Sequence, residues 1–103
     1  GVSSDVFGNV TATGFLSDSA DFGGGALPSN GGQDIVVARY SPTGTHLWSK
    51  SYGAAGTEVG RATAGAATGE VFITGLVTSP TDFGGGLMVG GGGEDIFLLK
   101  VAP

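Results

Sequence analysis

The feature that most constrains the fold of this chain is an internal repeat with a period of 61 residues. Residues 21–25, with the sequence DFGGG, return unchanged as residues 82–86. When residues 8–40 are aligned with residues 69–101, 13 of the 33 positions are identical and no gap is needed. A fixed period of this kind is typical of solenoids, propellers and arrays, in which each unit buries an apolar face against its neighbour.

The apolar residues fall in short segments rich in β-branched and aromatic side chains, with no long segment of helical period. Glycine clusters separate these segments, and the turn at residues 41–44 has proline second and glycine last, as in a type I turn. The chain is therefore predicted to be all-β. The expected strands lie near residues 1–4, 9–16, 34–40, 46–52, 59–66, 70–77 and 94–101.

Two segments, residues 35–38 and 96–99, are continuously apolar and show no alternation of apolar and polar positions. A strand of this kind is usually covered on both faces. We therefore predict that both segments lie between stacked sheets.

Each period supplies four strands, which is the number in one propeller blade. The segments GNVTATG, DFGGG, GGQDIVVARY and THLWSKSYG also resemble the bacterial β-propeller repeat family often labelled SBBP. This resemblance covers nearly the whole chain and implies blades of four antiparallel strands, about 1.7 blades in 103 residues. Residues 1–52 would form the first blade, and residues 53–103 a second blade that lacks its fourth strand.

Two incomplete blades cannot close a ring, because propellers have typically four to eight. An uncovered strand at the end of a sheet is also an adhesive edge. The expected partners are further blades, either from the same polypeptide or from other copies of the chain. Exchange of a strand between copies is a third arrangement.

The charge balance excludes some classes of partner. The formal net charge is −5, and four scattered cations do not form the basic patch that nucleic acid requires. No apolar stretch approaches the roughly 20 residues of a membrane-spanning helix. Cysteine is absent, which excludes disulfides, thiolate nucleophiles and cysteine-bound zinc.

Calcium is the cofactor that the sequence raises, because residues 90–98 fit the nonapeptide pattern of calcium-binding β-rolls. That pattern needs tandem copies nine residues apart, whereas the period here is 61, so we attribute the fit to glycine richness. Asp34 and Asp95 are the candidate metal ligands at the start of apolar strands. Capping of backbone N–H groups in the preceding turn is the interpretation we favour for both.

The candidate ligand-binding residues are Asp21, Asp82 and Trp48. For the two aspartates we again favour turn capping, and for Trp48 we favour packing within the blade over stacking on a sugar. Phe22 and Phe83, in the repeated glycine-rich loops, are expected to anchor those loops to the protein.

Three further polar residues have ordinary structural explanations. His46 is the one histidine, and a general base would need a nearby nucleophile and an orienting carboxylate, so it is expected to be an exposed residue of a hairpin. Glu58 and Arg61 are expected to form a surface ion pair or to brace the link between blades.

The sequence therefore predicts a non-enzymatic propeller segment that acts as a structural module or as a binding module for protein or glycan. A self-assembling propeller lectin is the alternative, followed by part of a propeller enzyme whose site lies elsewhere. The family resemblance implies a bacterial protein that is secreted or located at the cell surface.

Overall fold

The structure is a computed structural model that describes residues 1–29, 32–78, 81–83, 87–88 and 94–102. Every regular element in these ranges is a β-strand, so the predicted all-β class is confirmed. The strands are β1 (Val2–Ser4), β2 (Val10–Leu16), β3 (Ala20–Asp21), β4 (Ala26–Leu27), β5 (Asp34–Tyr40), β6 (His46–Tyr52), β7 (Glu58–Gly65), β8 (Val71–Val77), β9 (Thr81–Asp82), β10 (Leu87–Met88) and β11 (Asp95–Val101).

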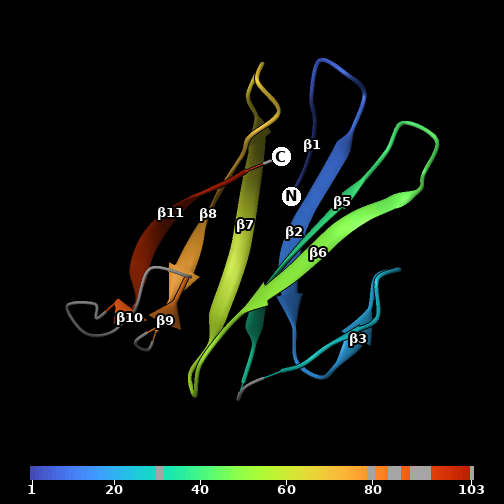
Figure 1. Cartoon of the computed structure of the whole chain (residues 1–103). Helices are drawn as coiled ribbons and strands as arrows, with labels where there is room; N and C mark the ends of the chain where they lie inside the picture. Colours follow the sequence, from blue (N-terminus) through green and yellow to red (C-terminus); the bar gives the residue numbers. More distant parts are fainter. Residues whose placement is uncertain (30–31, 79–80, 84–86, 89–93, 103) are drawn as a thin grey trace.

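The long strands form two antiparallel sheets that lie side by side (Figure 1). The first sheet has the order β1-β2-β5-β6, and the second has the order β11-β8-β7. All seven long strands begin and end within one residue of the predicted positions. The pairs β3–β4 and β9–β10 are two-residue ladders inside the long connections, and the sequence did not predict them. No closed barrel or propeller is formed by the described residues.

The repeat extends to the register of every shared pair of strands. In the first sheet Gly14 is opposite Val36, and in the second sheet Gly75 is opposite Phe97, 61 residues later in both strands. The same offset relates the β1–β2 ladder to β7–β8 and the β3–β4 ladder to β9–β10. Because a slip of one residue would turn every side chain to the other face, corresponding residues of the two copies lie on corresponding faces.

The hydrophobic core lies between the two sheets. Its buried centre consists of Ile35 and Val37 from β5 and of Val71, Ile73, Phe97 and Val101 from β8 and β11. Trp48, Tyr52, Val77, Phe83 and Leu99 pack around this centre. One face of each sheet therefore meets the other sheet, and each sheet keeps an outer face.

The two continuously apolar segments differ in their surroundings. Residues 35–38 of β5 are all buried, so the predicted burial is confirmed there, but within the described residues a second sheet packs on one face of β5 and not on both. In β11 the prediction is wrong, because Ile96 is 81% exposed and Leu98 is 76% exposed. Both side chains lie on the outer face of the second sheet, where the described part of the chain places no other sheet.

Candidate functional site

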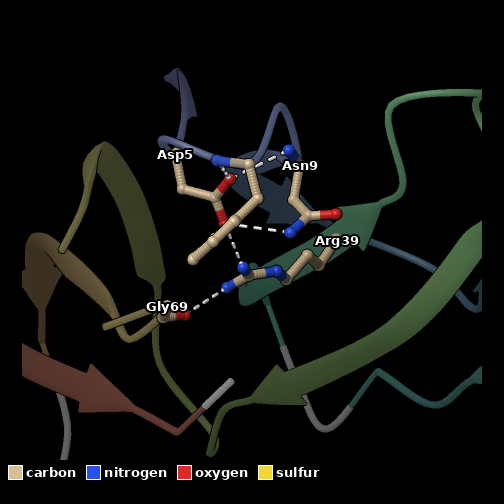
Figure 2. A network of polar contacts seen from close by, with 5 residues as sticks. Asp5, Asn9, Arg39 and Gly69 are labelled. Carbon is tan, nitrogen blue, oxygen red and sulfur yellow. Dashed lines mark hydrogen bonds and ion pairs between the residues drawn. The ribbon is translucent and has the colours of Figure 1, made fainter. Parts of the chain in front are cut away.

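A buried ion pair lies near the turn between β1 and β2, where the first sheet meets the second (Figure 2). The Asp5 carboxylate accepts hydrogen bonds from Arg39 Nη2, from Asn9 Nδ2 at 3.0 Å, and from the backbone N–H groups of Phe7 and Asn9 at 2.9 and 3.0 Å. Arg39 Nη1 donates to the Gly69 carbonyl of the second sheet at 2.6 Å. The side chains of Asp5 and Arg39 are each 4% exposed, so Arg39, held by Asp5 and bonded to Gly69, forms an internal cross-link between the sheets.

The surroundings of Asp5 act on its ionisation in opposite directions. Loss of contact with water would raise the pKa of the carboxyl, but the hydrogen bonds from Asn9 and Phe7 and the nearby Arg39 guanidinium together lower the pKa below its ordinary value of 3.8. The ionised form is therefore the one that the fold stabilises.

Replacement of Asp5 by asparagine is expected to flatten the acid side of the stability curve. Because the folded-state pKa of Asp5 is lowered, its contribution to stability is present above the unfolded-state pKa and is lost as the pH falls through the folded-state value. Thermal midpoints measured between about pH 2 and pH 6 should therefore fall more steeply for the natural chain than for Asp5→Asn. Parallel curves would show that Asp5 does not contribute through its ionisation.

Two buried carboxylates lie where the chain passes from the first sheet to the second. Asp34 begins β5 and is completely buried beside Gly53. Glu58 begins β7 and is also completely buried; its carboxylate lies 3.4 Å from the Ala54 N–H, and its own N–H donates to the Gln33 carbonyl at 2.7 Å. Glu58 therefore braces this link, which is the second of the two roles expected for it, and its complete burial rules out the first, a surface ion pair. Arg61 is exposed.

Replacement of Gly53 by alanine is expected to lower the free energy of unfolding by about 1–3 kcal/mol. A Cβ at this position would overlap the carboxylate of Asp34, and that side chain is completely buried. Gly14→Ala is the matched control, because a Cβ at Gly14 has nothing within 4 Å. Chemical denaturation of both variants checks this prediction, and equal stability of the two would contradict it.

The candidate metal ligands are not brought together. No group of three or more acidic or histidine side chains that could hold a metal ion occurs among the described residues. Asp95 begins β11 and is half-buried, in a different sheet from Asp34. Residues 90–93 of the nonapeptide segment lie outside the described residues, and calcium binding stays an untested prediction.

Asp21 has the capping role that we favoured. Its Oδ1 accepts hydrogen bonds from the backbone N–H groups of Gly23 at 2.8 Å and Gly25 at 3.1 Å. Both glycines have positive φ, of 123° and 105°, a conformation that other residues rarely adopt. The carboxylate thus holds a glycine turn, while the side chain of Asp82 lies outside the described part of the structure.

The loop aromatics pack onto the protein. The ring of Phe83 is stacked on Phe97 at a centroid distance of 5.0 Å and lies 5.5 Å from Tyr52 of the first sheet. Burial in this cluster raises the pKa of Tyr52. In the first copy, the Phe22 carbonyl accepts a hydrogen bond from the Tyr40 hydroxyl at 2.8 Å. These contacts support the anchoring role predicted for both phenylalanines.

His46 is half-buried, so the expectation of an exposed histidine is wrong. Its ring lies under Gly23 and Gly24, where a Cβ would meet the imidazole, and has its edge toward Tyr40 at a centroid distance of 5.7 Å. Its Nε2 lies 3.1 Å from Ser49 Oγ. The imidazole thus supports the glycine turn from below.

Trp48 packs against the core cluster from β6. The ammonium group of Lys50 lies 5.4 Å from the centroid of its ring. This placement agrees with the packing role that we favoured over sugar stacking.

Each outer face carries an apolar hollow. On the first sheet a hollow of about 200 Å³ is lined by Ala12, Gly14, Phe22, Val36, Ala38 and Tyr40, among others. On the second sheet a hollow of about 180 Å³ is lined by Ala62, Ala64, Phe72, Thr74 and Leu98, among others. Neither set includes a charged side chain, so both hollows are suited to apolar groups.

The cross-link between the sheets was not foreseen from the sequence. Asp5 and Arg39 are 34 positions apart, and the second copy has Ala66 and Lys100 at the corresponding positions. The signal that the sequence offered is Asp5 alone, a carboxylate in the first copy where the second copy has Ala66.

Comparison of the chain with protein-family models, with characterised proteins and with solved structures finds no match. No helix long and apolar enough to cross a membrane occurs in the ranges that the structure describes.

Proposed function

We propose that this chain is a non-enzymatic structural module in which the two sheets are consecutive blades of a β-propeller. The observation that carries the proposal is the identical register of the two copies, in which the β1–β2, β2–β5 and β3–β4 ladders recur after 61 residues as β7–β8, β8–β11 and β9–β10. The resemblance to the bacterial SBBP repeat supports the same assignment and favours a secreted or surface protein.

The repeated residues are used to build the module. Asp21 holds its turn, Phe83 enters the core, and the glycine turn of the first copy rests on His46. A binding module would instead present equivalent loop side chains to solvent in each copy. The described loop contacts are internal, which supports a scaffold over a lectin or an enzyme.

Amide hydrogen exchange followed by NMR tests this proposal. If the two sheets form one structural unit, amides of β5 in the first sheet and β8 in the second should exchange with the same free energy of opening. Opening of the second sheet at much lower free energy than the first would overturn the proposal.

The same spectra test the rival functions. On addition of a panel of oligosaccharides, a scaffold is expected to show no saturable shifts. Saturable shifts around Asp21 or Trp48 would favour a glycan-binding module and would contradict a purely structural role.

A further inference from the structure

We propose that the outer face of the second sheet docks onto the outer face of the first sheet in a second copy of this chain. This inference rests on the proposed structural function and names its partner. We call the outer face of the second sheet the leading face; it consists of Phe72, Thr74, Ile96, Leu98 and Lys100. We call the outer face of the first sheet the trailing face; it consists of Ala12, Gly14, Phe22, Val36 and Tyr40.

The leading face has the chemistry of a buried interface but is open to solvent. Its residues correspond, after 61 positions, to those with which the first sheet contacts the second. Ile96 corresponds to Ile35, and Leu98 corresponds to Val37; the two members from the first sheet are 0% exposed. Because corresponding residues lie on corresponding faces, the leading face is the counterpart of a face that is already buried once in this molecule.

The trailing face corresponds to the other side of the existing interface, the face of the second sheet that packs against the first sheet. Val36 corresponds to Phe97 and Tyr40 corresponds to Val101, and Phe97 and Val101 both lie in the core. Phe22 corresponds to Phe83, which packs on Tyr52 across the existing interface. The apolar hollow of about 200 Å³ on the trailing face therefore occupies the place that Ile35 and Val37 fill in the second sheet.

The turn that receives Arg39 is also present in both copies. The Gly69 N–H closes its turn by donating to the Ala66 carbonyl at 3.0 Å, and the Gly8 N–H donates in the same way to the backbone carbonyl of Asp5 at 3.1 Å. Both glycines have positive φ, of 94° and 83°. Lys100, which corresponds to Arg39, is thus placed to donate to the Gly8 carbonyl of a second copy.

Within the chain, the second repeat lacks the carboxylate that holds Arg39 in the first repeat, because Ala66 stands at the position that corresponds to Asp5. Lys100 instead forms an ion pair with Glu70, with 3.7 Å between Nζ and Oε2, and the Lys100 side chain is largely exposed. The contact between chains is therefore weaker than the contact within the chain. Since the two faces differ, the docking is head to tail and generates rings or filaments.

Sedimentation of the purified chain between about 1 µM and about 1 mM tests the docking. The average mass is expected to rise with concentration. Leu98→Glu should keep the chain monomeric, because it places a charge on the leading face without touching the core. Ala55→Glu is the matched control, since Ala55 is exposed in the link between β6 and β7 and belongs to neither face, and it should associate like the natural chain. A natural chain that stays monomeric throughout would overturn the proposal, and unchanged hydrogen exchange in that monomer would leave the proposed function standing.

A mixing experiment tests the head-to-tail geometry. Gly14→Glu should block the trailing face and stay folded, because a Cβ there meets nothing within 4 Å. Leu98→Glu and Gly14→Glu should each be monomeric alone, whereas an equimolar mixture should form a heterodimer through the remaining faces. Self-association of Gly14→Glu would indicate that two leading faces pair with each other and would overturn the head-to-tail assignment. Thermal unfolding of each variant verifies that it is folded.

A gain-of-function variant tests the role of Lys100. Ala66→Asp combined with Lys100→Arg rebuilds, in the second repeat of the chain, the aspartate–arginine pair that Asp5 and Arg39 form in the first repeat. Preorganisation of the guanidinium should lower the concentration at half-association by about tenfold. An unchanged midpoint would overturn the contact between Lys100 and the Gly8 turn.

Discussion

Replacement of Arg39 by methionine is expected to lower the free energy of unfolding by about 3 kcal/mol. The guanidinium is 4% exposed and makes contacts with Asp5 in the first sheet and with Gly69 in the second. Methionine has a similar length but donates no hydrogen bond, so the Asp5 carboxylate would lose its counter-charge in an enclosed position. Urea denaturation followed by the fluorescence of Trp48 measures the change.

The repeat supplies the control for this experiment. Lys100 corresponds to Arg39 but its side chain is 60% exposed, and its contact with Glu70 is 3.7 Å long. Lys100→Met should therefore change the stability by no more than about 1 kcal/mol. The double variant Asp5→Asn with Arg39→Met should recover part of the loss, because no charge is then left without its partner. A loss of less than 1 kcal/mol for Arg39→Met alone would contradict a structural role for the cross-link.

The strands and their order could be predicted from the sequence because their signals are local. Glycine turns such as residues 23–25 and the turn ending at Gly44 mark the ends of β-branched segments, and within residues 8–40 the repeat shows the same signals a second time. The two-residue ladders such as β3–β4 were not predicted, because strands of two residues are too short to show an alternation of apolar and polar positions.

The packing of the two copies could not be predicted in the same way. Ile35 and Ile96 are the same residue in the same local sequence, yet one is buried and the other is exposed. Burial here depends on which sheet lies opposite, and a local pattern carries no information on that. The same reason explains Glu58, whose complete burial follows from its place at the link between the sheets.

Truncation of Ile35, compared with the same truncation at Ile96, is expected to give the second large change in the free energy of unfolding. Ile35→Ala is expected to lower the free energy of unfolding by about 2–5 kcal/mol, because truncation of a fully buried side chain loses its transfer free energy and leaves a cavity between the sheets. Ile96→Ala makes the same chemical change, in a strand of the same register, at a side chain that is 81% exposed. In dilute solution, where the chain is monomeric, Ile96→Ala should change the stability by less than about 0.5 kcal/mol.

The comparison separates intrinsic strand preference from packing, since both variants lose the same β-branched residue. Equal losses at the two positions would show that strand preference dominates and that the sheets do not form the tight interface described above. A large loss at Ile35 alone would show that the interface stabilises the fold. A loss at Ile96 that appears only as the protein concentration rises would then have a direct physical meaning: the exposed isoleucine is buried when a second copy supplies the sheet that its counterpart already has.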